Sequence, residues 1–172
     1  DDTKLVRNGL YRVGIFGDFY SDSFEIFHGP AKDREFDFVL VCVKSFDTEN
    51  AGKELQEWLP NSSNIVLCQN GWGNAEIFSK YFQNVFNARV ITGFIRIQKN
   101  KVDVTVHAQP VHLGSLLGGN LNCLEPLAKA LKEGGLPSVV TPYIAKDLWA
   151  KMLYNCPLNA LGALLKIPYG LL

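Results

Sequence analysis

The sequence has no excess of either charge and no long apolar run, and these absences exclude several classes of protein. Seventeen Lys and Arg residues balance seventeen Asp and Glu residues, so no net positive field attracts nucleic acid or an anionic membrane surface. No apolar run approaches the roughly 20 residues that cross a bilayer. The polar start at Asp1 also lacks the basic and apolar regions of a signal peptide. We therefore expect a cytoplasmic protein that binds neither nucleic acid nor membrane.

Cysteine is scarce, and the sequence contains no Cys-x-x-Cys pair. The wide spacing of the cysteines argues against both a zinc site and a disulfide framework. The residues next to each cysteine in the sequence are mostly apolar. We therefore expect reduced core residues at Cys42, Cys68, Cys123 and Cys156. His107 and His112 are five residues apart in a strand-like segment, which places them on opposite faces. No metal site is predicted.

The composition, 47% hydrophobic and 20% charged over 172 residues, is typical of a globular protein with one real core. Residues 9–27 are rich in aromatics and broken by glycine, which predicts a β-hairpin. An apolar run at 36–43 and another at 64–69 predict buried parallel strands. Apolar residues at helical spacing follow each strand and predict helices at 47–59 and 74–82. Asp47 is the expected N-cap of the first helix. This βαβ pattern predicts an α/β fold with helices on both faces of a parallel sheet.

The second half continues the pattern and then changes character. Residues 88–113 alternate like two or more strands, with a hairpin turn at 99–101. A helix at 121–132 and a short strand at 138–141 follow. Residues 144–165 then form one long helical segment that is apolar on nearly every side. We place a domain boundary there, with the sheet domain over 1–142 and the first helix of a second domain over 143–172.

Two polar residues stand where the buried parallel strands end. Lys44 terminates the first of them and Asn70 the second. In an open parallel sheet, ligands bind outside the carboxyl ends of the strands. A lysine there can reach a phosphate, and an asparagine can both donate and accept hydrogen bonds. The alternative is that both are ordinary loop residues.

The long helical segment carries a polar stripe on an otherwise apolar helix. Lys151, Asn155 and Asn159 are spaced by four and so share one helix face. Burying an unpartnered amide costs about 1 to 3 kcal/mol, so the stripe faces either a polar ligand or solvent. Pro157 inside the segment predicts a kink, because it removes one backbone hydrogen bond.

Three motifs in this order resemble the ketopantoate reductase family. The family pattern has a strand ending in Val-Lys, a strand ending in Gln-Asn-Gly with a second glycine, and a helix with Trp-x-Lys followed by two asparagines at four-residue spacing. The corresponding residues here are Val43-Lys44, Gln69-Asn70-Gly71-Trp72-Gly73, and Trp149-Ala150-Lys151 with Asn155 and Asn159. The likeness covers essentially the whole chain.

The resemblance implies a Rossmann-like, doubly wound, mostly parallel sheet followed by the start of an all-helical domain. It implies NADPH-dependent reduction of 2-dehydropantoate (ketopantoate) to pantoate, in the route to pantothenate and coenzyme A. Lys151 would be the catalytic acid, and Asn155 and Asn159 would bind substrate. Lys44, Asn70 and Gly71 would contact NADP, with Asn70 also near the substrate. The resemblance also implies that the protein binds a small keto acid, and it allows a homodimer.

The chain also departs from the family pattern. The family's Gly-x-Gly-x-x-Gly turn is expected before residue 1, because the segment from Gly14 to Gly17 lacks the third glycine and a following helix. A second catalytic carboxylate and a substrate-binding serine are expected beyond Leu172. Tyr169 replaces a further asparagine of the family. Two alternatives therefore stay open: a paralogous reductase of another keto acid, and a noncatalytic relative of the fold.

Overall fold

The computed structural model describes residues 8–168 and 171, and its centre is a five-stranded sheet. The strand order is β3-β4-β5-β8-β9. Adjacent strands run parallel except β5 and β8, which are antiparallel. The strand bounds are β3 Val39–Val41, β4 Asn64–Leu67, β5 Asn84–Arg89, β8 Val111–Gly114 and β9 Ser138–Val140. The expected mostly parallel sheet is confirmed.

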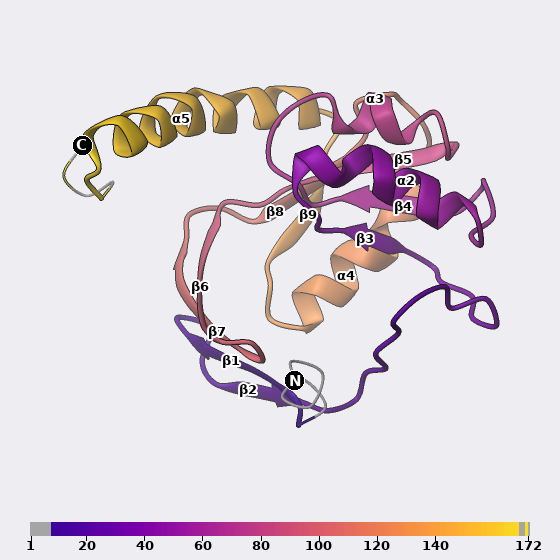
Figure 1. Ribbon diagram of the computed structural model, residues 1–172, viewed down its shortest axis with the longest axis horizontal. Coiled ribbons are helices and arrows are strands. Elements are labelled where there is room, and N and C mark those ends of the chain that lie inside the picture. Colours follow the sequence, from indigo (N-terminus) through magenta and orange to yellow (C-terminus); the bar gives the residue numbers. More distant parts are fainter. Residues whose placement is uncertain (1–7, 169–170, 172) are drawn as a thin grey trace.

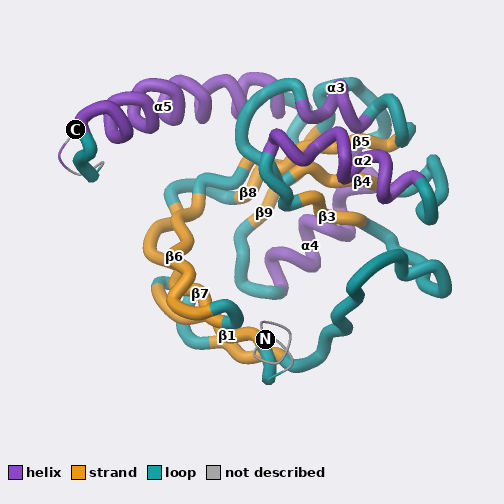
Figure 2. The backbone as a smooth tube through the Cα atoms, in the orientation of Figure 1, coloured by secondary structure: helices purple, strands orange, loops and turns teal. Residues whose placement is uncertain are grey.

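Helices cover both faces of this sheet, as Figures 1 and 2 show. One core cluster joins the sheet to α2 (Thr48–Gln56) and α3 (Asn74–Phe78), and includes the fully buried Phe78. A second cluster on the other face packs against α4 (Glu125–Glu133). Two 3₁₀ turns, Ser45–Asp47 and Leu121–Leu124, precede α2 and α4. The sheet is therefore doubly wound, as the βαβ spacing predicts.

A second sheet lies beside the first (Figure 1), with the order β2-β1-β7-β6. Its strands are β1 Leu10–Gly14, β2 Phe19–Ser21, β6 Thr92–Gln98 and β7 Lys101–His107. Both predicted hairpins are confirmed, since β1 pairs antiparallel with β2 and β6 with β7. Gly17 donates its N–H to the carbonyl of Gly14 at 2.9 Å, so this glycine pair forms the first hairpin's turn.

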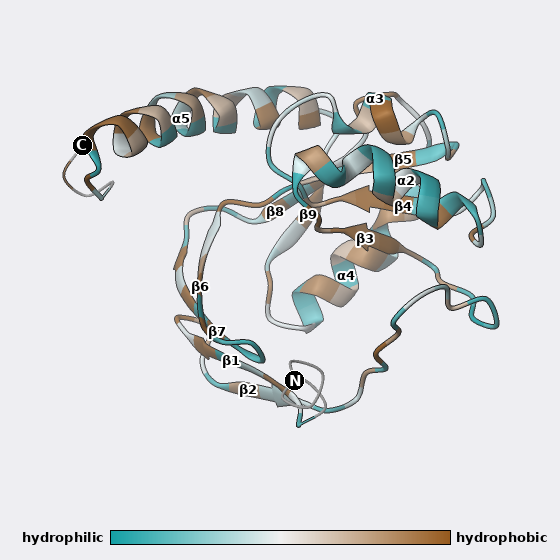
Figure 3. Ribbon diagram, in the orientation of Figure 1, coloured by the Kyte–Doolittle hydropathy of each residue, from teal (hydrophilic) through white to brown (hydrophobic). Residues whose placement is uncertain are grey.

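The long C-terminal helix is confirmed as α5, which spans Ile144–Leu165. Its start packs on the sheet through the buried Ile144 and Leu148, and the rest extends away from the body as a continuous, curved helix (Figure 1). Apolar side chains stay exposed along it, including Leu153 at 71% and Leu164 at 78%, and Figure 3 shows brown residues on several sides of α5. Among the described residues, no helix has the length and apolar character needed to span a membrane.

Three details of the predicted elements are wrong. The helix expected over 74–82 ends at Phe78. The strand β5 begins at Asn84, four residues before the predicted strands begin. Its start was missed because the two asparagines of this strand interrupt the apolar pattern. Asp47 is at the N-cap position but makes no capping bond. Its backbone is already near-helical, with φ −94° and ψ 0°, because the preceding 3₁₀ turn leads directly into α2.

The expectation for the cysteines holds in part. All four are free, and Cys68 and Cys123 are partly buried against the second core cluster. Cys42 and Cys156 are exposed and are not core residues, because Cys42 follows the end of β3 and Cys156 lies on the extended part of α5. The two histidines belong to different sheets, since His107 ends β7 and His112 lies in β8. Over residues 8–168 and 171, no group of three or more His, Cys, Asp or Glu side chains could hold a metal ion.

Candidate functional site

The loops after β3 and β4 meet at one edge of the sheet. The two strands are parallel and adjacent, so their carboxyl ends, and with them Lys44 and Asn70, lie at the same edge. The hydroxyl of Ser45 donates to the carbonyl of Asn70 at 3.0 Å and joins the two loops. Lys44 lies in the first loop, directly before the 3₁₀ turn Ser45–Asp47, and is exposed. Residues of both loops thus form the edge at which ligands of open parallel sheets bind.

The turn after Asn70 depends on two glycines. Gly71 and Gly73 have φ values of +95° and +92°, a left-handed conformation that side chains with a Cβ rarely adopt. The turn reverses the chain directly into α3, whose N-cap is Gly73. Gly71 also leaves the backbone open beside Asn70, which permits close approach of a ligand.

A buried polar network holds these loops in place. Thr48 is fully buried, and its hydroxyl donates to Oδ1 of Asn74 at 2.9 Å and accepts from Nε2 of Gln69 at 2.8 Å. Nδ2 of Asn74 in turn donates to the carbonyl of Asn70 at 3.3 Å. The sequence analysis did not single out Thr48 or Asn74. The signal available for them was weak, a polar residue in the first turn of each of two helices.

Lys151 joins α5 to this edge. Its ammonium donates to Oδ1 of Asn70 at 2.6 Å and to the carbonyl of Val90, which follows β5. The side chain is partly buried, and burial, followed by the positive charge of Arg89, lowers the pKa of Lys151 below its ordinary value. The helix stripe therefore points its lysine at the sheet edge and away from bulk solvent.

The two asparagines of the stripe continue along the same face of α5. Asn155 is partly buried and Asn159 is exposed. Neither amide has a hydrogen-bond partner within residues 8–168 and 171. Tyr169 lies outside the described residues. The structure thus places Lys151 against Asn70 and leaves the other two amides of the stripe free to meet a ligand.

Behind Lys151 lies a charged cluster that the sequence analysis missed. Arg89 on β5 is only 2% exposed, donates to Oε1 of Gln109 at 2.7 Å, and is paired in register with His112 on β8. Nδ1 of His112 lies 2.7 Å from Oδ2 of Asp147 on α5. Asp147 precedes Lys151 by four residues and so shares its helix face. This four-residue spacing could have identified Asp147 from the sequence.

An aromatic contact also ties the helix to the loop. The rings of Trp72 and Trp149 lie with centroids 5.3 Å apart and planes tilted by 39°. Trp72 follows Gly71 in the turn, and Trp149 is two residues before Lys151. The ring contact and the Lys151–Asn70 hydrogen bond thus join the same two segments.

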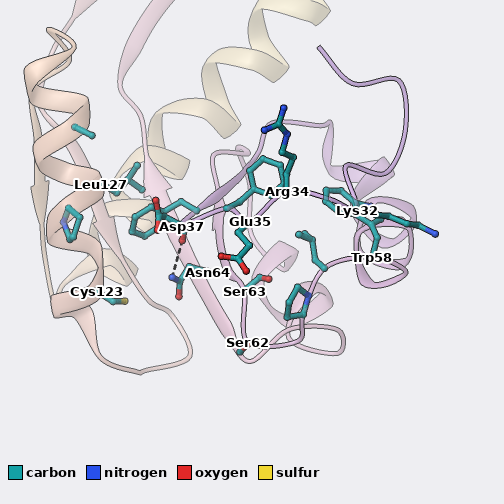
Figure 4. A pocket seen from close by; sticks show the side chains of 16 residues that line it. Lys32, Arg34, Glu35, Asp37, Trp58, Ser62, Ser63, Asn64, Cys123 and Leu127 are labelled. Atoms are coloured by element: carbon teal, nitrogen blue, oxygen red, sulfur yellow. Dashed lines mark hydrogen bonds between the residues drawn. The ribbon is translucent and has the colours of Figure 1, made fainter. Parts of the chain in front are cut away.

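A cavity in the described part of the chain lies away from this edge. It has a volume of about 920 Å³ and lies between α4, the segment 32–38 and the connection before β4. Figure 4 shows it beside Asp37, whose carbonyl accepts from Nδ2 of Asn64 at 3.0 Å. Asn64 is the first residue of β4, so this cavity is at the amino ends of the strands. Ligands of open parallel sheets bind at the opposite ends.

Comparison with known proteins points to one family. Residues 4–118 match the family model described as "Ketopantoate reductase PanE/ApbA". The 2-dehydropantoate 2-reductase of Aquifex aeolicus is 34% identical over 137 residues, which cover 78% of this chain and 44% of that protein. The crystal structure of 2-dehydropantoate 2-reductase from Geobacter metallireducens has a TM-score of 0.83 at 26% identity, covering 94% of this chain and 54% of that one.

A further solved structure supports the fold alone. D-mandelate dehydrogenase in its ternary structure with NADH and anilino(oxo)acetate has a TM-score of 0.80 at 17% identity, over 96% of this chain. The chain spans about half the length of the relatives that it matches, between 44% and 54% for these three.

Proposed function

The chain belongs to the ketopantoate reductase family, and we propose that the complete protein reduces 2-dehydropantoate to pantoate with NADPH. The observation that carries this proposal is the hydrogen bond from the Lys151 ammonium to Oδ1 of Asn70 at 2.6 Å. It joins the start of α5 to the carboxyl edge of a doubly wound sheet. A reductase needs an acid at that meeting point, next to the place where a dinucleotide binds.

The residues at the edge fit a dinucleotide. Lys44 offers an exposed cation that can reach a phosphate, and Asn70 offers an amide. Gly71 lets the backbone approach a ligand closely, because it has no Cβ. The bound cofactor would supply the hydride. We assign Lys44, Asn70 and Gly71 to NADP binding, and the preference for NADP over NAD rests on the family alone.

Lys151 is the proposed acid. A ketone that accepts hydride at carbon gains negative charge on its oxygen, and a positioned ammonium stabilises that charge and then donates a proton from Nζ. The lowered pKa of Lys151 makes its ammonium a stronger acid than an exposed lysine. Asn70, Asn155 and Asn159 would hold the substrate, because amides pair with carboxylate, hydroxyl and carbonyl oxygens alike.

We also propose the domain division. Residues 1–142 would be the remainder of the NADP-binding domain, and residues 143–172 would contain the first helix of a helical substrate domain. The support is the exposed apolar surface of α5, at Leu153 and Leu164 among others, which requires a partner segment. A cytoplasmic location, a role in the pantothenate and coenzyme A route, and a homodimer belong to the same proposal.

Steady-state kinetics of the full-length protein test the function. Lys151→Ala should lower kcat by about 10²- to 10⁴-fold, the usual range for general acid catalysis, while NADPH affinity measured by nicotinamide fluorescence stays nearly unchanged. Asn155→Ala should act mostly on KM. A Lys151→Ala enzyme with wild-type kcat would remove the lysine from the mechanism.

The same assay separates the alternatives. A paralogous reductase would turn over another keto acid with a higher kcat/KM than 2-dehydropantoate. A noncatalytic relative would show no NADPH oxidation with any keto acid.

A further inference from the structure

Two cysteines far apart in the sequence lie side by side at the candidate site. Cys42 directly follows β3 and Cys68 directly follows β4. The strand register pairs Val41 with Leu67, and the N–H of Cys68 donates to the carbonyl of Val41 at 3.0 Å. The ladder therefore continues by one residue and sets the two cysteines opposite each other. Side chains at paired positions point to the same face of a sheet.

This placement suits a disulfide. Neighbouring strands lie about 4.8 Å apart, and the Cα atoms of disulfide-bonded cysteines are usually separated by about 4.4 to 6.8 Å. Cys42 is exposed, so a small reagent can reach it, whereas Cys68 is partly buried beside it. The pair thus combines one accessible thiol with one that is less exposed and lies beside it.

The two thiols also differ in acidity. The hydrogen bond from Cys68 lowers the pKa of Cys42 to about 7, although burial acts in the opposite direction. The same hydrogen bond, together with burial, raises the pKa of Cys68. Because the thiolate is the nucleophilic form, Cys42 would react first and Cys68 second.

We propose that Cys42 and Cys68 form a peroxide-sensitive dithiol that closes to a reversible disulfide. The Cys42 thiolate attacks one oxygen of hydrogen peroxide and breaks the O–O bond, which yields a sulfenic acid and hydroxide. The hydroxide takes up the proton that Cys42 lost and becomes water. The Cys68 sulfur then attacks the sulfenic sulfur, the S–O bond breaks, and the thiol proton leaves with the oxygen as a second water. Two thiols are oxidised and one peroxide is reduced.

The two cysteines lie next to the residues of the proposed cofactor site. The expected effect of NADPH on their oxidation therefore rests on the proposed function. Lys44 comes two residues after Cys42, and Asn70 two residues after Cys68. We therefore expect a ligand held by those two residues to hinder access to Cys42. Bound NADPH should slow the oxidation, and the disulfide should weaken NADPH binding.

The test uses the reduced full-length protein treated with hydrogen peroxide at pH 7, digested and analysed by mass spectrometry. The expected product is a Cys42–Cys68 cross-linked peptide pair that dithiothreitol reverses. In a Cys68→Ala variant, Cys42 should stop at a sulfenic acid that dimedone traps. Oxidation of Cys123 or Cys156 without a Cys42–Cys68 linkage would overturn the proposal.

A second measurement tests the acidity of Cys42 in the absence of oxidant. The rate of Cys42 alkylation by iodoacetamide should rise with a midpoint near pH 7, and the midpoint should move to higher pH in Cys68→Ala because the hydrogen bond that lowers the pKa of Cys42 is gone. Cys156, exposed on α5, is the internal reference. Identical profiles for Cys42 in both proteins would also overturn the proposal. Disulfide formation that NADPH does not slow would count against the cofactor site and would leave the dithiol standing.

Discussion

Removing the side-chain amide of Asn70 should slow catalysis through Lys151. In Asn70→Ala the partly buried ammonium loses the Oδ1 acceptor 2.6 Å away and, among the described residues, keeps the carbonyl of Val90 as its acceptor. A hydrogen bond to a charged group contributes about 1.5 to 3 kcal/mol. Each 1.36 kcal/mol corresponds to about a tenfold change in rate, so kcat should fall by roughly 10- to 150-fold.

A double-mutant cycle separates this effect from a separate role of Asn70. If the amide acts by positioning the lysine, its removal should cost little in kcat once Lys151 is already alanine, and the two effects should be strongly non-additive. The assay is single-turnover reduction at saturating NADPH in four proteins: wild type, Asn70→Ala, Lys151→Ala and the double variant. Asn61→Ala is the matched control, because this amide donates to the carbonyl of Tyr81 away from the site. Fully additive effects on kcat would refute the positioning argument.

Two further predictions concern groups behind the site. Arg89→Met should move the alkaline limb of kcat to higher pH: activity is lost as Lys151 deprotonates, and the Arg89 charge helps to lower the pKa of Lys151. A limb that stays in place or moves to lower pH would contradict this. Thr48→Val should lower the free energy of unfolding by about 1 to 3 kcal/mol in urea denaturation, because it leaves the amides of Gln69 and Asn74 without their buried partner. Wild-type stability would show that the two amides find other partners.

The helices, the strands and the position of Lys44 and Asn70 at one edge of the sheet could be predicted from local sequence patterns. The bounds of α5 were predicted from residues 144–165 alone, because the long apolar, helix-forming run is a property of one continuous segment. Lys44 and Asn70 could be placed at one edge without coordinates, because parallel strands joined by one crossover helix have their carboxyl ends on the same side. The strand β5 was partly missed, since Asn84 and Asn87 interrupt its apolar run.

Contacts between distant segments were decided only by the tertiary structure. The sequence predicted that Lys151 faces a ligand or solvent, but the hydrogen bond to Asn70 spans 81 residues and depends on how α5 packs against the sheet. Arg89, His112 and Asp147 meet because the β5–β8 register and the first turn of α5 bring them together. Cys42 and Cys68 were expected to be separate core residues, and only the β3–β4 register makes them neighbours. The sequence thus determined the chemistry available at each element, whereas strand register and helix packing, which depend on the whole chain, decided which of those groups meet.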